Sequence, residues 1–175
     1  MPAPTKKLQA TAYHESGHVI ASFYLDIPFE YATIKPNENS LGHVQYTTKR
    51  AVRKSRIMKK IINSTGNLTL YNRIIIESEI ISNFSGFFAE RKFTGRGNKI
   101  GASSDWKETM DTVRVIESSD NVNDKYLNYC AALAEEIVIN PIRWKDIKIV
   151  AENLILRETL TYTEIQKIIA ELALA

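Results

Sequence analysis

The sequence is poor in cysteine and in long apolar runs. Its single cysteine, Cys130, cannot form a disulfide within the chain, which is typical of proteins in a reducing compartment. No stretch reaches the roughly 18 apolar residues of a membrane span, because the best candidate, Ile74 to Phe88, is interrupted by Glu77 and Glu79. The N-terminus lacks the apolar core of a signal peptide. We therefore expect a soluble, cytoplasmic protein without a transmembrane segment.

The sequence also shows no internal repeat, low-complexity tract or linker, so we expect one domain over residues 1–175. A chain of this length buries roughly 70% of the surface that its unfolded form exposes. Its folding therefore needs neither a disulfide nor a structural metal.

Apolar residues recur with helical spacing along most of the chain. Two short β-rich runs, 30–35 and 42–48, flank the turn sequence "PNENSL" and predict a hairpin. The predicted helices cover about 8–24, 68–91, a stretch from Asp105 onward, 123–138, 141–156 and 162–174. The predicted fold is α+β and mainly helical: a first helix with a small β-hairpin or sheet, followed by a helical bundle.

Positive charge is concentrated between Lys49 and Lys60, which include seven basic residues and no acid. The simplest interpretation is a solvated, mobile face. Val52, Ile57 and Ile61 could instead give a short basic amphipathic helix an apolar edge. Interleaved aromatic residues are absent, which argues against nucleic acid. An acidic partner or another anionic surface is a hypothesis for this segment.

Histidine is scarce, yet two of the three histidines, His14 and His18, stand four residues apart in the first predicted helix. This spacing places both imidazoles on one helix face, where they could share a metal ion. Glu15 projects about 100° away from His14, so it could act as a base without being a ligand. His-Glu-x-x-His is the pattern of zinc hydrolases, in which Zn²⁺ acidifies a bound water and the glutamate accepts its proton. The alternative is an exposed histidine pair on a surface helix.

Gly17 lies inside the same predicted helix, where glycine costs roughly 1 kcal/mol relative to alanine. Either a substrate or another backbone approaches closely at this position, or Gly17 is a helix-packing contact.

A catalytic zinc ion normally has three protein ligands, and the residues alone leave the third one open. The candidates are His43, Glu38, Glu77, Glu79 and Asp105. His43 falls on a predicted strand and Glu38 in a turn. Asp105 stands where a glycine-rich loop meets a helix, and with Glu108 three residues later it also has the form of a helix cap.

Several stretches together resemble the peptidase domain of the FtsH family of ATP-dependent zinc metalloproteases. They are "AYHESGH", "ATIKPNENSLGHVQY", "SGFFAERKFTG", "GASSDWKETMDTVR" and "LILRETLTYTEIQKII", which cover nearly the whole chain in the family's order. The resemblance implies that Asp105 is the third zinc ligand beside His14 and His18. It also implies that Glu15 is the general base, that the fold is mainly helical with a small β element, and that the substrate is unfolded polypeptide.

The chain also departs from the family pattern. FtsH proteins carry an AAA+ ATPase and usually membrane spans, whereas no GxxxxGK[ST] phosphate loop occurs here. We therefore expect a stand-alone peptidase that cleaves unfolded polypeptide or is served by a separate ATPase. Phe87 and Phe88 enlarge positions that are usually small, and Arg91 replaces an acid. Because of these changes, the sequence does not tell whether the chain forms the homo-oligomer contacts of the family.

Two other functions are compatible with the sequence. One is a catalytically silent, peptidase-like module that binds a protein partner. The other is an anion-binding protein that uses the segment Lys49 to Lys60. For the peptidase, an extended substrate could pair with the free edge of the hairpin. The sequence does not tell which of its two strands is the edge.

Overall fold

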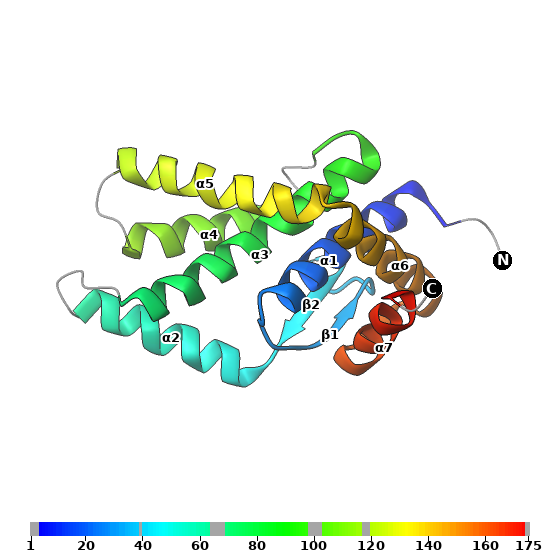
Figure 1. The fold of residues 1–175 in the computed structure, drawn as a ribbon, viewed down its shortest axis with the longest axis horizontal. Coiled ribbons are helices and arrows are strands. Elements are labelled where there is room, and N and C mark those ends of the chain that lie inside the picture. The colour runs from blue at the N-terminus through cyan, green and yellow to red at the C-terminus, as the bar shows by residue number, and fades with distance from the viewer. Residues whose placement is uncertain (1–3, 39, 64–68, 98–102, 117–119, 174–175) are drawn as a thin grey trace.

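A computed structural model describes the chain except for residues 1–3, 39, 64–68, 98–102, 117–119 and 174–175. The residues that it describes form seven helices and a three-stranded antiparallel sheet (Figure 1). The helices are α1 (Lys6–Tyr24), α2 (Thr48–Asn63), α3 (Leu70–Thr94), α4 (Ser103–Ile116), α5 (Asp120–Ile139), α6 (Pro141–Arg157) and α7 (Tyr162–Ala173). The strands are β1 (Phe29–Thr33), β2 (His43–Tyr46) and β3 (Thr159–Thr161). The mainly helical α+β fold predicted from the sequence is confirmed.

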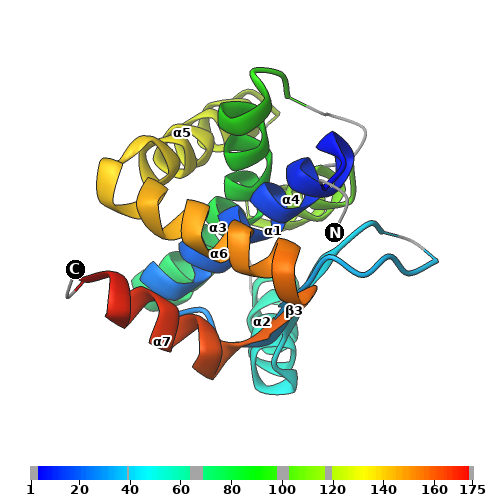
Figure 2. The ribbon, with the colours of Figure 1, turned by 90° about the vertical axis from the view of Figure 1, so that its right-hand side faces the viewer.

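Helix α1 lies at the centre of the molecule, between α3 and α6 (Figures 1 and 2). The hydroxyl of Thr5 caps its start by accepting a hydrogen bond from the backbone N–H of Leu8 at 3.2 Å. Residues 12 to 22 are all buried, including the polar ones. The helix was predicted correctly, but its apolar spacing did not reveal that a whole stretch of it is enclosed by other elements.

Helices α1 and α3 cross where each carries a glycine. A Cβ atom on Gly17 would lie 2.4 Å from the carbonyl oxygen of Ser85. A Cβ atom on Gly86 would lie 2.3 Å from Nε2 of His18. Since real Cβ atoms do not approach so closely, only glycine allows this crossing. Gly17 is therefore the packing contact with another backbone that the sequence suggested, and the crossing places His18 directly over α3.

The sheet has the order β2-β1-β3, so β1 is its interior strand. Thr33 of β1 stands opposite His43 on one side and opposite Thr159 on the other. The predicted hairpin is confirmed as the antiparallel pair β1 and β2. Of these two strands, β2 is the one at the edge, and within the described residues no strand pairs with its outer side.

Strand β3 was not predicted, because its three residues are too few to show an alternating pattern. It lies directly before α7, which begins with the capping box that the sequence suggested. The Glu164 carboxylate accepts a hydrogen bond from the backbone N–H of Thr161 at 2.8 Å, and the N–H of Glu164 donates to the Thr161 hydroxyl at 3.4 Å. The chain thus turns from β3 into α7 without a loop.

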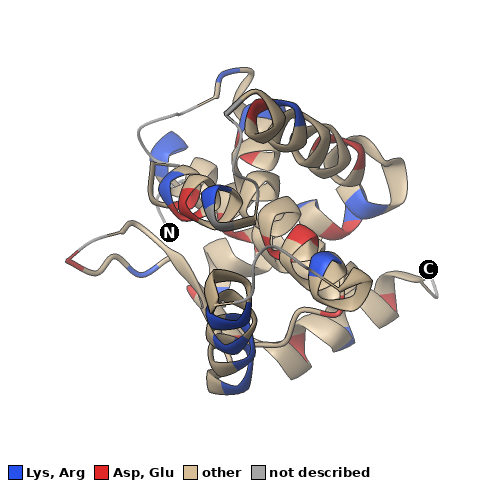
Figure 3. Ribbon diagram, turned by 90° about the vertical axis from the view of Figure 1, so that its left-hand side faces the viewer, with Lys and Arg blue, Asp and Glu red and all other residues tan. Residues whose placement is uncertain are grey.

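The basic segment forms helix α2, the basic amphipathic helix that the sequence analysis offered as an alternative. Ile57 and Ile61 are buried on its inner side, and Lys54 forms an ion pair with Glu108 of α4. No residue of α2 is acidic, and its basic residues show as a band along the helix (Figure 3). One side of α2 is therefore held against the protein, while most of its charge faces outward.

A buried ion pair joins α2 to α3. Nε of Arg50 donates to Oε1 of Glu79 at 2.8 Å, and both side chains are almost fully buried. The guanidinium of Arg50 also lies 3.3 Å from the ring centroid of Tyr46 on β2. Because unpairing either charge would leave the other buried, this contact holds α2, α3 and the sheet in one arrangement.

The remaining predicted helices are present with ends shifted by a few residues. Helix α4 begins at Ser103, so Asp105 lies within its first turn and not at the N-cap. The predicted start at Leu68 and part of the glycine-rich loop lie outside the described residues. Among the helices that the structure describes, none has the length and apolar character needed to cross a bilayer.

Candidate metal centre

Three side chains from two helices converge on one point. Nε2 of His14 lies 3.1 Å from Nε2 of His18. Oδ2 of Asp105 lies 3.3 Å from the first of these nitrogens and 3.5 Å from the second. Both histidines are buried on α1, and Asp105 reaches them from the first turn of α4. Three electron-pair donors at this separation require a cation or shared protons between them.

The spacing of the three atoms fits a tetrahedral metal ion. Ligand bonds of about 2.0–2.1 Å to nitrogen and oxygen give tetrahedral edges of about 3.3 Å. The three measured separations are 3.1, 3.3 and 3.5 Å. Two imidazoles and one carboxylate also form a donor set that zinc accepts, with a fourth position left for water. The residues present therefore fit a zinc ion with one coordination position left open.

The outer nitrogen of each imidazole has its own partner. Nδ1 of His14 lies 3.0 Å from Oε2 of Glu90, and Nδ1 of His18 lies 2.8 Å from the carbonyl oxygen of Ser82. Both partners are hydrogen-bond acceptors, so Nδ1 of each ring is placed to donate to them while Nε2 faces the shared point. Partners of this kind orient metal-binding histidines and strengthen them as ligands.

Helix α4 is held so that Asp105 faces the histidines. The ring of the next residue, Trp106, packs edge-on against Phe84 at 4.9 Å and against Phe87 at 6.3 Å between centroids. Thr109 is buried one turn later and accepts a hydrogen bond from the side-chain amide of Asn83 at 3.4 Å. The packing of α4 on α3 thus fixes the position of the carboxylate.

The two phenylalanines that depart from the FtsH pattern belong to the core. Phe87 and Phe88 are each only 8% exposed. Arg91 forms an ion pair with Glu135 of α5, and its guanidinium lies 4.7 Å from the ring centroid of Phe88. These residues join α3 to α4 and α5 inside the chain.

The charged groups of the centre shift one another's pKa values. Burial by itself lowers the pKa of His14, but hydrogen bonds to Asp105 and Glu90 outweigh it and raise the pKa to about 10. Burial would raise the pKa of Asp105, yet the neighbouring imidazoles of His18 and His14 hold that pKa well below its usual range. The site therefore favours an anionic Asp105 beside positive charge, which is the environment that a bound cation would share.

Glu15 is buried beside the three converging side chains. Burial raises the pKa of its carboxyl group, and the imidazoles of His14 and His18 partly offset this rise. A Cβ atom on Gly42, the residue before β2, would lie 3.0 Å from Cγ of Glu15. The chain thus passes close to Glu15 at Gly42, and both residues line the same cleft.

The converging side chains line a cleft of about 500 Å³. Glu15 belongs to its lining, and so do Leu41 to Val44, which lead into and form the start of the edge strand β2. An extended chain bound along β2 would therefore pass the three donor atoms.

The other ligands considered from the sequence do not reach the centre. His43 lines the cleft but lies near Tyr31 and Asn37, at 3.5 Å from each. Glu79 is occupied by Arg50. Glu77 accepts a hydrogen bond from Tyr126 at 2.8 Å. Within the part of the chain that the structure describes, His14, His18 and Asp105 form the one cluster able to hold a metal ion, and Glu38 is not part of it.

Glu90 is the functional candidate that the sequence analysis missed. It is 7% exposed, although it lies in a helix rich in apolar residues. A signal was present, because Glu79, Ser82, Gly86 and Glu90 are spaced three, four and four residues apart and so share one face of α3. A polar stripe on an otherwise apolar helix predicts buried polar neighbours. These are Arg50 for Glu79 and the imidazole face of α1 for the rest of the stripe.

Replacing Glu90 with glutamine should weaken zinc binding by roughly 10- to 100-fold, as loss of an outer partner of a metal-bound histidine does. Glutamine preserves the size of the side chain but removes the charge that supports His14. Competition with a chromophoric chelator measures the affinity. Glu136→Gln is the control, since Glu136 is exposed on α5, and its affinity should equal that of wild type. Equal affinities in all three proteins would exclude this role for Glu90.

No model of a known protein family matches the chain, and no curated protein sequence matches it either.

Proposed function

We propose that this chain is a zinc-dependent metallopeptidase of the FtsH peptidase type, which hydrolyses unfolded or flexible polypeptide. The observation that carries the proposal is the convergence of His14, His18 and Asp105 at separations of 3.1 to 3.5 Å. Their place in a cleft beside a buried glutamate supports a hydrolytic role over a structural metal site. A structural zinc site would be closed by four protein ligands.

His14, His18 and Asp105 would hold the ion. When bound, zinc supplies Lewis-acid chemistry: it acidifies water and polarises a peptide carbonyl. Glu90 and the carbonyl of Ser82 keep the two imidazoles oriented for this purpose.

Glu15 would serve as the general base. Its carboxylate accepts the proton of the attacking water and then gives this proton to the nitrogen of the departing amine. A carboxyl group with a raised pKa suits both steps, because it can hold the proton between them. Its burial next to the imidazoles keeps it within the cleft and away from bulk solvent.

The polypeptide would bind as an added strand on the outer edge of β2. This edge has no strand partner among the described residues, and its residues line the same cleft as the metal ligands. Backbone hydrogen bonds to β2 would hold any extended sequence, which favours unfolded substrates of many sequences. The buried, unpaired Cys130 fits a reducing compartment, and we place the activity in the cytoplasm.

Metal removal tests the proposal. The zinc-loaded chain should cleave fluorescein-labelled casein, an unfolded polypeptide, and treatment with 1,10-phenanthroline should abolish the cleavage. Stoichiometric zinc added after removal of the chelator should restore it, whereas magnesium should not, because Mg²⁺ prefers oxygen ligands. A chain that holds one zinc ion but cleaves no unfolded polypeptide would instead support the alternative of a catalytically silent binding module. Cleavage that survives the chelator would contradict a metal mechanism.

A further inference from the structure

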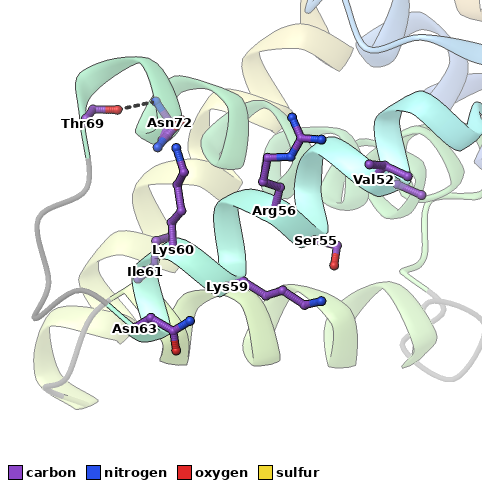
Figure 4. Close-up of a pocket in the computed structure, with 10 residues that line it drawn as sticks. Val52, Ser55, Arg56, Lys59, Lys60, Ile61, Asn63, Thr69 and Asn72 are labelled. Carbon is purple, nitrogen blue, oxygen red and sulfur yellow. Dashed lines mark hydrogen bonds between the residues drawn. The ribbon is translucent and has the colours of Figure 1, made fainter.

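A second hollow lies along α2, beside the start of α3. It measures about 940 Å³, and we call it the basic groove. Its lining consists of Ala51, Val52, Ser55, Arg56, Lys59, Lys60, Ile61 and Asn63 of α2 with Thr69 and Asn72 at the start of α3 (Figure 4). It contains none of the metal-centre residues, so the proposed peptidase mechanism makes no use of it.

The groove is rich in positive charge. Among the described residues that line it, Arg56, Lys59 and Lys60 are basic and none is acidic. Figure 4 shows Lys60 extending toward the start of α3, while Arg56 and Lys59 stand along α2. Both of the latter are exposed, and the described residues give neither an ion-pair partner. By contrast Arg50 and Lys54, on the inner side of α2, are each paired.

The same groove has apolar walls. Val52, although 51% exposed, lies in its lining together with Ala51 and Ile61. Ile62 at the end of α2 and Leu70 at the start of α3 are not part of this lining but lie near it in the chain, and they are 68% and 75% exposed. The lining therefore combines the exposed Val52 with the exposed cations Arg56 and Lys59, a mixed surface of the kind that another molecule can cover.

The length and the composition of the basic groove favour one class of binding partner. Val52, Arg56, Lys59 and Asn63 are spaced four, three and four residues apart, so they form one face of α2 over about 16 Å. A helix of about 11 residues matches this length. Single-stranded nucleic acid would need aromatic platforms, which the described lining lacks.

We propose that the basic groove binds an acidic amphipathic helix of a partner protein. The apolar face of that helix would pack on the exposed Val52 and Ala51, and its carboxylates would pair with Arg56 and Lys59. This inference does not depend on the metal centre. Its test measures binding and not cleavage, so it can fail while the peptidase proposal stands.

A labelled synthetic peptide of 14 residues, with leucine along one helical face and glutamate elsewhere, is the probe. Fluorescence anisotropy should show saturable binding to the chain that weakens as the salt concentration rises. The double variant Arg56→Glu/Lys59→Glu should lower the affinity by about tenfold or more. Val52→Asn leaves the charge unchanged and should lower it by about fivefold, because it removes apolar contact.

The matched control is Lys145→Glu/Lys148→Glu, which reverses two exposed charges with the same spacing on α6. This variant should bind the acidic peptide within about twofold of wild type, after allowance for the long-range loss of positive charge. A peptide with lysine in place of glutamate should bind the Arg56→Glu/Lys59→Glu variant more tightly than wild type. Circular dichroism should show unchanged folds, since all four substituted side chains are exposed.

Three outcomes would overturn the proposal. In the first, the acidic peptide does not bind, or the two double variants lower its affinity equally. In the second, phosphatidylserine vesicles bind the chain through Arg56 and Lys59 while the peptide does not. In the third, these substitutions instead dissociate a homo-oligomer, which light scattering would detect. The last two would assign the groove to a membrane or to a second copy of the chain.

Discussion

The Glu15→Gln variant should lose casein cleavage by about 10²- to 10⁴-fold, the usual contribution of general acid–base catalysis. It should still bind one zinc ion per chain. Glutamine has the size of glutamate and can remain in the same buried place, but it cannot accept a proton from water. The ligand atoms belong to other residues, so metal binding should persist. Initial rates of cleavage and metal content, measured on the same samples, provide the comparison.

Glu38→Gln is the matched control for this result. Glu38 is exposed between β1 and β2 and is not part of the metal cluster, so its removal should leave the rate unchanged. If Glu15→Gln cleaves as fast as wild type with zinc bound, the base has been assigned wrongly. If it loses zinc as well as activity, Glu15 contributes to the metal site itself.

The Asp105→Ala variant should lose both zinc and cleavage. Its Oδ2 atom completes the set of three donors, and the two histidines alone leave a site open to more water. Zinc affinity should fall by more than the roughly 10- to 100-fold expected from the loss of an outer partner such as Glu90. Titration with zinc in the presence of a competing chelator measures this directly.

A competing interpretation gives Asp105 only the role of an acid in the first turn of α4, where its charge stabilises the helix, and the same variant separates the two. Loss of this charge would cost about 0.3–1 kcal/mol in the free energy of unfolding and leave zinc affinity unchanged. Asp111→Ala is the control, because Asp111 lies on α4 with an exposed side chain. It should bind zinc as wild type does. Asp105→Ala with full zinc content and lowered stability would support the helix-stabilising role and remove the third ligand from the proposal.

Helical spacing predicted the elements of this fold well, but it predicted their surroundings poorly. The range 8–24 was recognised as helical, yet the pattern could not show that residues 12 to 22 are buried on every side. That enclosure depends on Gly17 and Gly86, which lie far apart in the sequence and meet only when α1 and α3 cross. Strand β3 escaped notice because three residues show no alternation, and only their pairing with β1 defines them.

In the candidate site, too, local spacing predicted some residues, whereas long-range contacts determine the place of others. His14, Glu15 and His18 lie within one helical turn, so their local spacing sufficed to predict them. For the third ligand, the residues alone gave five candidates and did not single out Asp105. Its packing through Trp106 against α3 places it near the histidines, and this long-range contact has no local signature.

Other contacts of the site were missed for a similar reason. Glu90 lies 76 residues from His14 in the chain, and only the polar stripe on α3 pointed to it. For the basic segment, the sequence favoured a solvated, mobile face over an amphipathic helix, because charge density says nothing about burial. Arg50 is nevertheless buried by its pairing with Glu79.

The most direct test of the account is a crystal structure of the chain loaded with zinc. We predict one ion within about 2.0–2.2 Å of Nε2 of His14, Nε2 of His18 and a carboxylate oxygen of Asp105, with Glu90 still hydrogen-bonded to His14. A structure in which zinc binds elsewhere, or in which the Asp105 carboxylate turns away from both imidazoles, would contradict the central claim.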